Sequence, residues 1–309
     1  MFTLRHVTSL NRMRRKFLCG VAWLLWAQCL RAQSVPARDL WEFPLGAVLE
    51  PAALAIEPGS GLWNPASIRL NKLQRWRVGV VSLQPASDQG VDGRLVAVSL
   101  RRSDGVTLGF SIAQSSVVSL VRTETDPQAL GAVPYSSMLV STSAAHDLLP
   151  HVTVGAAIRY RSGRADRFSD HALAADLGLI VHSLPIRDAR VALSSFLWRP
   201  GREIDDRPAF VAAGDARFMG EAGRETRLGY SYNAVTRGAR EHGPFLAWRY
   251  DRVDLRGALL RTDASGRSVF RLRSGIALHY ARYVVGVARE EGTTGLGPLY
   301  QFTLSSLLR

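Results

Sequence analysis

The chain has almost no cysteine. Its 309 residues include two, Cys19 and Cys29, and both precede residue 33. The same stretch has basic residues between positions 5 and 16 and an apolar run over residues 17–30, which is the pattern of a secretory signal peptide. We therefore expect residues 1–32 to be a signal peptide. The mature protein would then have neither disulfides nor cysteine-bound metal.

Long apolar runs are also absent. The run over residues 17–30 is shorter than the about 20 residues that a membrane-spanning helix needs, and no later run reaches that length. The formal net charge is +13, but residues 1–32 carry six basic side chains and no acidic one, so it falls to +7 beyond them. The remaining arginines are scattered, which favours a rim facing lipid headgroups over a nucleic-acid surface.

Catalytic and metal-binding patterns are missing as well. His182 and Ser183 are adjacent, so a strand would turn their side chains to opposite faces and they could not act together. Residues 229–233 only half resemble a nucleophile elbow, because no strand-to-helix context surrounds them. We therefore expect no enzyme activity and no cofactor. No metal site is expected either, because these histidines lack ligand spacing: His146, His151, His171, His182, His242 and His279.

What the chain does have is a period of two from residue 76 onward. Residues 152–161 are the clearest example, with Ile158 on an apolar face and Arg159 on a face of small and charged residues. Residues 270–281 repeat the scheme. Such alternation predicts β-strands. We expect them at residues 76–84, 93–102, 106–117, 136–147, 151–162, 171–183, 189–199, 208–219, 225–234, 243–251, 253–262, 269–280, 282–291 and 296–308.

The length of these strands decides between two all-β architectures. Strands of a soluble sandwich usually have about 5 to 6 residues, whereas a membrane-spanning strand needs about 9 to 11. The sequence therefore predicts a transmembrane antiparallel up-and-down β-barrel of about 14 strands over residues 76–309. Aromatic residues at strand ends fit the two membrane interfaces. The candidates are Trp76, Tyr135, Tyr160, Trp198, Tyr250, Tyr283 and Tyr300.

Charged residues occupy the polar faces of the predicted strands. A charge facing lipid at mid-membrane costs about 2 to 4 kcal/mol, so these side chains should point into the lumen and pair there. They are Arg159, Arg161, Asp176, Arg190, Arg227, Arg271 and Arg273.

Residues 33–75 form a separate region that precedes the strands. Five prolines recur through it and exclude a long helix. Asn64 followed by Pro65 is a good helix start, because Asn caps free backbone N–H groups and Pro suits the first helical position. We expect a short helix from Pro65 to about Gln74, with Ile68 and Leu73 on neighbouring faces.

Part of this region is similar to a known family. Residues 53–55 read A-L-A, and residues 62–66 read L-W-N-P-A after two glycines. This resembles the signature near the mature N-terminus of FadL-type outer-membrane proteins, including their PorV/PorQ branch. The chain departs from the family at Ser67 and Ile68, where Gly and Leu are usual.

The resemblance implies a bacterial outer-membrane protein whose residues 33–75 fold into the lumen as a plug. In FadL-type transporters such a plug gates the passive passage of hydrophobic small molecules, with lateral exit through the wall. In the PorV/PorQ branch the barrel is a component of protein secretion or surface attachment and does not transport. A capped turn that docks a strand is the alternative to a plug. The residues carried over as plug elements are Trp63, Asn64, Pro65 and Ala66.

The last predicted strand carries a second resemblance. Gly297, Tyr300 and Phe302 have a spacing similar to the signal by which the barrel-assembly machinery recognises outer-membrane barrels. Gly295 stands where that signal has a polar residue, and the sequence continues to Arg309. The implied partners are the assembly machinery and outer-membrane lipid, with hydrophobic small molecules or secretion-system proteins according to the branch.

Overall fold

The computed structural model describes most of the chain beyond the predicted signal peptide. Residues 1–32 and both cysteines lie outside the described residues, and the side chain of Trp198 does too. The described residues are 35–38, 40, 45–48, 50–56, 59–71, 73–86, 90–122, 131–198, 209–221, 223–234, 240–264, 267–291 and 297–308.

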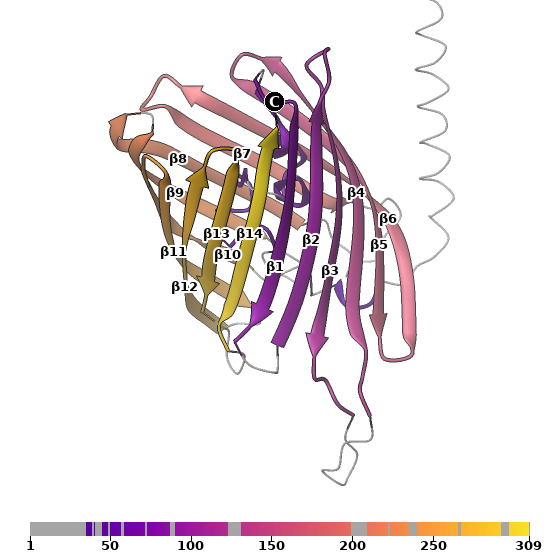
Figure 1. The fold of residues 1–309 in the computed structure, drawn as a ribbon. Helices are drawn as coiled ribbons and strands as arrows, with labels where there is room; N and C mark the ends of the chain where they lie inside the picture. The colour runs from indigo at the N-terminus through magenta and orange to yellow at the C-terminus, as the bar shows by residue number, and fades with distance from the viewer. Residues whose placement is uncertain are drawn as a thin grey trace, which may run out of the picture.

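The described residues fold into fourteen strands preceded by two short 3₁₀ helices, η2 (Ser60–Leu62) and η3 (Pro65–Ile68). Each strand pairs antiparallel with its neighbours in sequence, and β1 pairs with β14, which closes the barrel seen in Figure 1. The strands are β1 (Trp76–Pro85), β2 (Gly90–Arg101), β3 (Thr107–Val118), β4 (Tyr135–Leu149), β5 (Val152–Ala165), β6 (Phe168–Leu184), β7 (Ala189–Trp198), β8 (Ala209–Glu221), β9 (Arg224–Ala234), β10 (Arg240–Tyr250), β11 (Val253–Ala264), β12 (Arg267–Tyr280), β13 (Tyr283–Glu290) and β14 (Leu299–Leu308).

The prediction of a closed antiparallel barrel with about 14 strands is confirmed. All fourteen predicted strands occur, each with ends within three residues of the predicted ones. The agreement follows from the period of two, which is set locally by which face of each strand carries apolar side chains.

The apolar face of each strand points outward. In β5, Ile158 and Tyr160 are exposed, whereas Arg159 and Arg161 are each only 2% exposed. Along β10 the outward apolar residues run from Pro244 through Leu246 and Trp248 to Tyr250, a distance of about 20 Å along the strand. That is close to the outward apolar band of about 25 Å in membrane-spanning barrels.

No helix in the described part of the chain is long and apolar enough to cross a membrane.

The predicted aromatic residues do not all face outward. Trp76, Tyr250 and Tyr283 are exposed on the outer face near one rim. Tyr135 points the other way and packs against the buried core. The prediction for Tyr135 is wrong because β4 places its odd-numbered residues inside, as the buried Ser137 shows.

The two rims differ in the length of their connections. One rim, here called the short-turn rim, joins strands through residues 102–106, 150–151, 185–188, 222–223, 251–252 and 281–282. The opposite rim, here called the long-loop rim, includes the connections 119–134, 199–208 and 291–298. Outer-membrane barrels have short periplasmic turns and longer extracellular loops.

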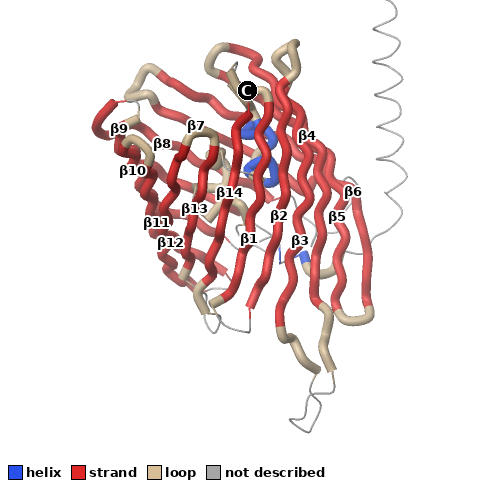
Figure 2. Tube along the Cα trace, in the orientation of Figure 1, coloured by secondary structure: helices blue, strands red, loops and turns tan. Residues whose placement is uncertain are grey.

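The described residues between 35 and 71, here called the inner segment, lie inside the barrel. Gly46 donates its N–H to the side chain of Gln301 on β14 at 2.8 Å. Glu50 contacts β11, and η3 packs on β4, β5 and β6. One segment can reach the inward side of all these strands only from within the lumen. Figures 1 and 2 show its short helices behind β14, β1 and β2.

The predicted helix after Asn64 is shorter than expected. It ends at Ile68, because Arg69 has extended backbone angles (φ −45°, ψ 133°). Both backbone groups of Leu70 are then held by side chains of β2 and β3. Leu73 is consequently 75% exposed and does not pack beside Ile68. The prediction of a helix to about Gln74 is wrong.

Candidate functional site

Asn64 is the centre of the inner segment's hydrogen bonding and is fully buried. Its side-chain oxygen accepts the N–H of Ala66 at 3.0 Å, which caps η3. Its amide nitrogen donates to the carbonyl of Ala53 at 2.9 Å and to that of Leu179 on β6 at 3.4 Å. One side chain therefore joins two parts of the inner segment to the wall.

Trp63 binds an earlier part of the inner segment. Its ring N–H donates to the carbonyl of Leu45 at 2.8 Å, and its side chain is buried with Leu54 and Leu62. The buried Pro65 forms the first residue of η3. The structure thus places the W-N-P-A run inside the barrel.

Two glycines form the seat for this run. A Cβ on Gly155 of β5 would lie 2.3 Å from the backbone N of Ala66, and one on Gly178 of β6 would lie 2.0 Å from Oδ1 of Asn64. A Cβ on Gly163 would lie 1.8 Å from the carbonyl oxygen of Pro36. The backbone of the inner segment therefore touches the wall itself. Sequence reasoning missed these glycines as site residues, although they stand on the polar faces of strands.

An ion pair beside this seat joins the wall to the inner segment. Arg159 of β5 pairs with Asp176 of β6, and both are buried. Arg159 also donates to the carbonyl of Gly61 at 3.2 Å. Arg161 is buried on the same inward face.

The opposite part of the wall carries larger charge networks. On β10, β12 and β13, Arg271 and Arg273 alternate with Glu241 and Glu290. Arg273 lies 3.0 Å from Glu241 and 2.6 Å from Glu290, and Arg271 lies 2.5 Å from Glu290. Each carboxylate is shared by two guanidinium groups, which satisfies buried charge on both sides.

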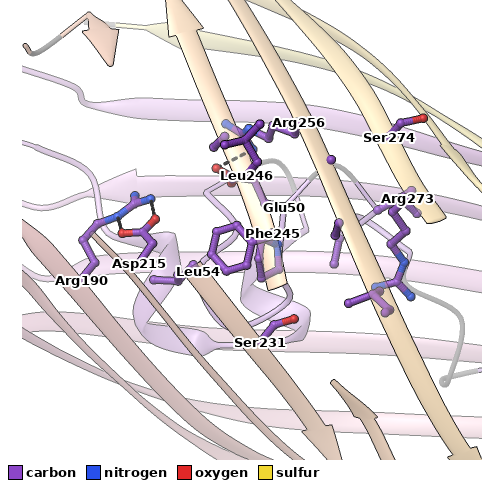
Figure 3. A pocket seen from close by; sticks show the side chains of 17 residues that line it. Glu50, Leu54, Arg190, Asp215, Ser231, Phe245, Leu246, Arg256, Arg273 and Ser274 are labelled. Atoms are coloured by element: carbon purple, nitrogen blue, oxygen red, sulfur yellow. Dashed lines mark hydrogen bonds and ion pairs between the residues drawn. The ribbon is translucent and has the colours of Figure 1, made fainter. Parts of the chain in front are cut away.

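A second network lies on β7, β8 and β9. Arg227 contacts Asp215 at 2.8 Å, Glu225 at 3.2 Å and Asp188 at 3.3 Å. Arg190 binds the same Asp215 with two nitrogens, one at 3.0 Å. Figure 3 shows this pair facing the side chains of Leu54 and Phe245 across a cavity.

An ion pair fastens the inner segment to this part of the wall. Glu50 lies 2.5 Å from Arg256 of β11, and their side chains are 8% and 10% exposed. The other carboxylate oxygen of Glu50 accepts the N–H of Ile56 at 2.6 Å. Arg256 also contacts Asp254 at 3.3 Å. Sequence reasoning missed Glu50 and Arg256, because nothing local links a residue before the strands to one in β11.

Two cavities lie between the inner segment and strands β7–β12, with empty volumes of about 530 and 660 Å³ that are partly open to solvent. The first is mainly apolar, with Val48, Leu54, Phe245 and Leu260 in its lining. The second is lined mainly by charged residues of the short-turn side. The two cavities share Glu50, Arg190, Ala247 and Arg256.

The residues of the predicted assembly signal lie at the start of the last strand. Gly297 precedes β14, and Tyr300 and Phe302 point to the outer face. Phe302 pairs across the sheet with Ser82 of β1 and Val287 of β13. Among the described residues, no group of three or more His, Cys, Asp or Glu side chains could hold a metal ion.

The fold and the outward apolar band define a membrane-spanning β-barrel with a chain segment in its lumen. No protein-family model matches the chain, and no curated protein sequence matches it either.

Solved structures are similar to the chain at low sequence identity. One is the TodX deltaS2S3 mutant monoaromatic hydrocarbon channel, with 9% identity over 79% of this chain and 92% of that chain, at a TM-score of 0.51. A KdgM porin has 8% identity over 75% of this chain and 99% of that one, at 0.39. OprB from Pseudomonas putida has 6% identity over 76% and 92%, at 0.41. The likeness to the TodX structure supports the barrel fold and does not extend to a ligand.

Proposed function

We propose that the protein is a bacterial outer-membrane barrel for passive transport of small hydrophobic molecules, with residues 33–75 as a plug, as in FadL-type proteins. The observation that carries this proposal is the pair of adjoining cavities between the inner segment and strands β7–β12. A fully packed lumen would offer no such space. The TodX structure, by its title a monoaromatic hydrocarbon channel, is compatible in fold with this role.

The lining of the first cavity supports an exit through the wall. Leu246, Gly257 and Ser274 face outward on neighbouring strands, yet they line the same cavity as the inward Phe245. A Cβ on Gly257 would meet only one atom, 3.9 Å away. Pro244 has no backbone N–H to pair with β11. The apolar cavity therefore reaches the wall where Gly257 leaves open space.

The passage is closed where the two cavities meet. Glu50, Arg190 and Arg256 stand at that junction and are each engaged in an ion pair. Removing one partner of a buried pair costs about 3 to 5 kcal/mol, so the Glu50–Arg256 pair holds the inner segment firmly. Transport therefore requires the inner segment to shift at Glu50.

Uptake in cells tests the proposal. Cells that lack the gene should grow poorly when a long-chain fatty acid or an aromatic hydrocarbon is the only carbon source. The wild-type gene should restore growth. The variant Leu54→Trp, which fills the apolar cavity, should not restore it, although the barrel still reaches the membrane. Normal uptake without the gene, combined with loss of surface proteins, would reject transport.

A second candidate function is a non-transporting part of a secretion or surface-attachment system, as in the PorV/PorQ branch. Exposed apolar side chains near the short-turn rim favour it, namely Leu73, Leu148, Leu149 and Ile186. Such side chains suit a protein partner. The variant Ile186→Asp should then impair surface proteins and leave uptake unchanged.

A further inference from the structure

The outer face of β9–β12 carries polar side chains near the long-loop rim, where the neighbouring outward residues are apolar. They form what is here called the outer polar cluster: Tyr230, His242, Arg261, Asp263 and Ser268. The strand register places His242 opposite Arg261, and Asp263 opposite Ser268. Their inward neighbours, such as Glu241, bind Arg271 and Arg273 inside the lumen. The cluster therefore faces away from the lumen, towards lipid.

The cluster is a continuous chain of contacts. The hydroxyl of Tyr230 lies 2.6 Å from Nδ1 of His242, whose Nε2 lies 3.5 Å from Asp263. Arg261 donates to Asp263 at 2.8 Å and to Ser268 at 3.0 Å. Ser268 donates to the same oxygen of Asp263 at 2.5 Å. These bonds hold the Arg261 guanidinium in a fixed position on the surface.

Arg240 adds a positive charge that the cluster does not neutralise. It stands opposite Asp263 in the register, but the carboxylate of Asp263 is already occupied by Arg261, Ser268 and His242. Arg240 is exposed and makes no ion pair within the part of the chain that the structure describes. The surface thus has one more cation than anion.

Below the cluster the outer face is apolar. Phe270 stands opposite Arg261, and the pair Leu259 and Leu272 lies one step further from the rim; all three are exposed. A ligand that contacts both the polar cluster and this apolar surface needs an anionic head at the arginines and a hydrocarbon tail along the leucines and the phenylalanine. That is the chemistry of an anionic lipid.

We propose that the outer polar cluster and Arg240 bind the phosphate-bearing headgroup of an outer-leaflet glycolipid, with its acyl chains against Leu259, Phe270 and Leu272. Arginine suits phosphate because its planar guanidinium donates two parallel hydrogen bonds. Basic groups at a membrane surface attract anionic lipid. The long-loop rim faces the cell exterior in outer-membrane barrels. The proposal rests on the outer-membrane location proposed above, but not on transport.

The other ends of these strands supply matched controls. Arg224 lies over the ring of Tyr250 at 5.0 Å, and Arg282 lies over Tyr283 at 5.1 Å. Each is an exposed arginine near an aromatic ring at the short-turn rim. Neither has the Asp, Ser and His framework that fixes Arg261.

The test is retention of lipid by the purified folded barrel in native mass spectrometry. The probes are bis-phosphorylated lipid A, its dephosphorylated form and phosphatidylethanolamine. The wild-type barrel should retain lipid A under activation that removes the other two. The double variant Arg240→Gln/Arg261→Gln should lose about tenfold or more of that retention, because charge-assisted hydrogen bonds to phosphate disappear. The double variant Arg224→Gln/Arg282→Gln should retain it.

Heat-dependent gel mobility shows that each variant is folded. Equal retention by wild-type protein and the Arg240/Arg261 variant would overturn the proposal. Complete competition by inorganic phosphate would also overturn it, since the site would then recognise the free ion and not the lipid. Uptake by the Arg240/Arg261 variant should be normal, which keeps a failure of this proposal distinct from a failure of the transport proposal.

Discussion

Two parts of the barrel interior are built differently: strands β5 and β6, here called the fixed half, and strands β7–β12, here called the open half. On β5 and β6 the wall is cut back to glycine, and the backbone of the inner segment touches it at Gly155 and Gly178. On β7–β12 the wall carries arginines paired with carboxylates, and cavities separate it from the inner segment. One half therefore fixes the inner segment and the other leaves room beside it. Glu50 is the point at which the inner segment crosses that room.

The largest effect is expected from breaking the ion pair on the fixed half. Asp176→Ala leaves the buried Arg159 without its carboxylate, which should cost about 3 to 5 kcal/mol of stability. Urea unfolding of the barrel in vesicles, followed by tryptophan fluorescence, measures the loss. Permeability should not rise. An increase in permeability without a loss of stability would contradict the assignment of this half as the fixed one.

Overpacking the glycine seat should have the next largest effect. Gly155→Val places atoms where the backbone of Pro65 and Ala66 lies, and overpacking of this kind costs about 1 to 3 kcal/mol or more. The inner segment should leave its seat and become accessible to protease. Gly257→Val is the control, because the space beside Gly257 is open. If the inner segment is equally protected from protease in both variants, the glycine seat is not needed to hold it.

The third prediction concerns the open half, at the junction of the two cavities, where Glu50 pairs with Arg256. Arg256 and Arg249 both bind Asp254, and Arg256 also pairs with Glu50 of the inner segment. Arg256→Gln should therefore raise the permeability of reconstituted vesicles to a small hydrophobic dye. Arg249→Gln should change it much less, because the inner segment stays attached. Equal permeability of the two variants would argue against Glu50 and Arg256 as the closure.

The strands could be predicted from the sequence because apolar and polar residues alternate along each one, and this alternation does not depend on other strands. The partners of charged residues could not. Arg273 stands on a visibly polar face, but its carboxylates are Glu241 and Glu290 on other strands, and only the register of the closed sheet brings them together. In the same way, the need for glycine at position 155 comes from Ala66, which the local pattern of β5 does not contain.

In the inner segment, tertiary contacts override a local helix signal. Asn64 and Pro65 begin a helix as their types predict. The sequence after them could continue it, but β2 and β3 take both backbone groups of Leu70. Tertiary hydrogen bonds thus replace those of a longer helix. The placement of Asn64 in the lumen likewise depends on a contact with the wall, the hydrogen bond to Leu179 of β6.

The smallest effect on equilibrium stability is expected on the outer face of β14, which belongs to neither half. Phe302 points outward and pairs with β1 and β13 at the closing seam. If Gly297, Tyr300 and Phe302 are read by the barrel-assembly machinery, Phe302→Ala should slow insertion into the outer membrane. The unfolding free energy of barrels that have already folded should change little, because the side chain contacts lipid. Leu304→Ala on the same face is the control for lost apolar area. Pulse-chase assembly in cells, scored by heat-dependent gel mobility, should separate the two variants, and equal rates would remove Phe302 from the proposed signal.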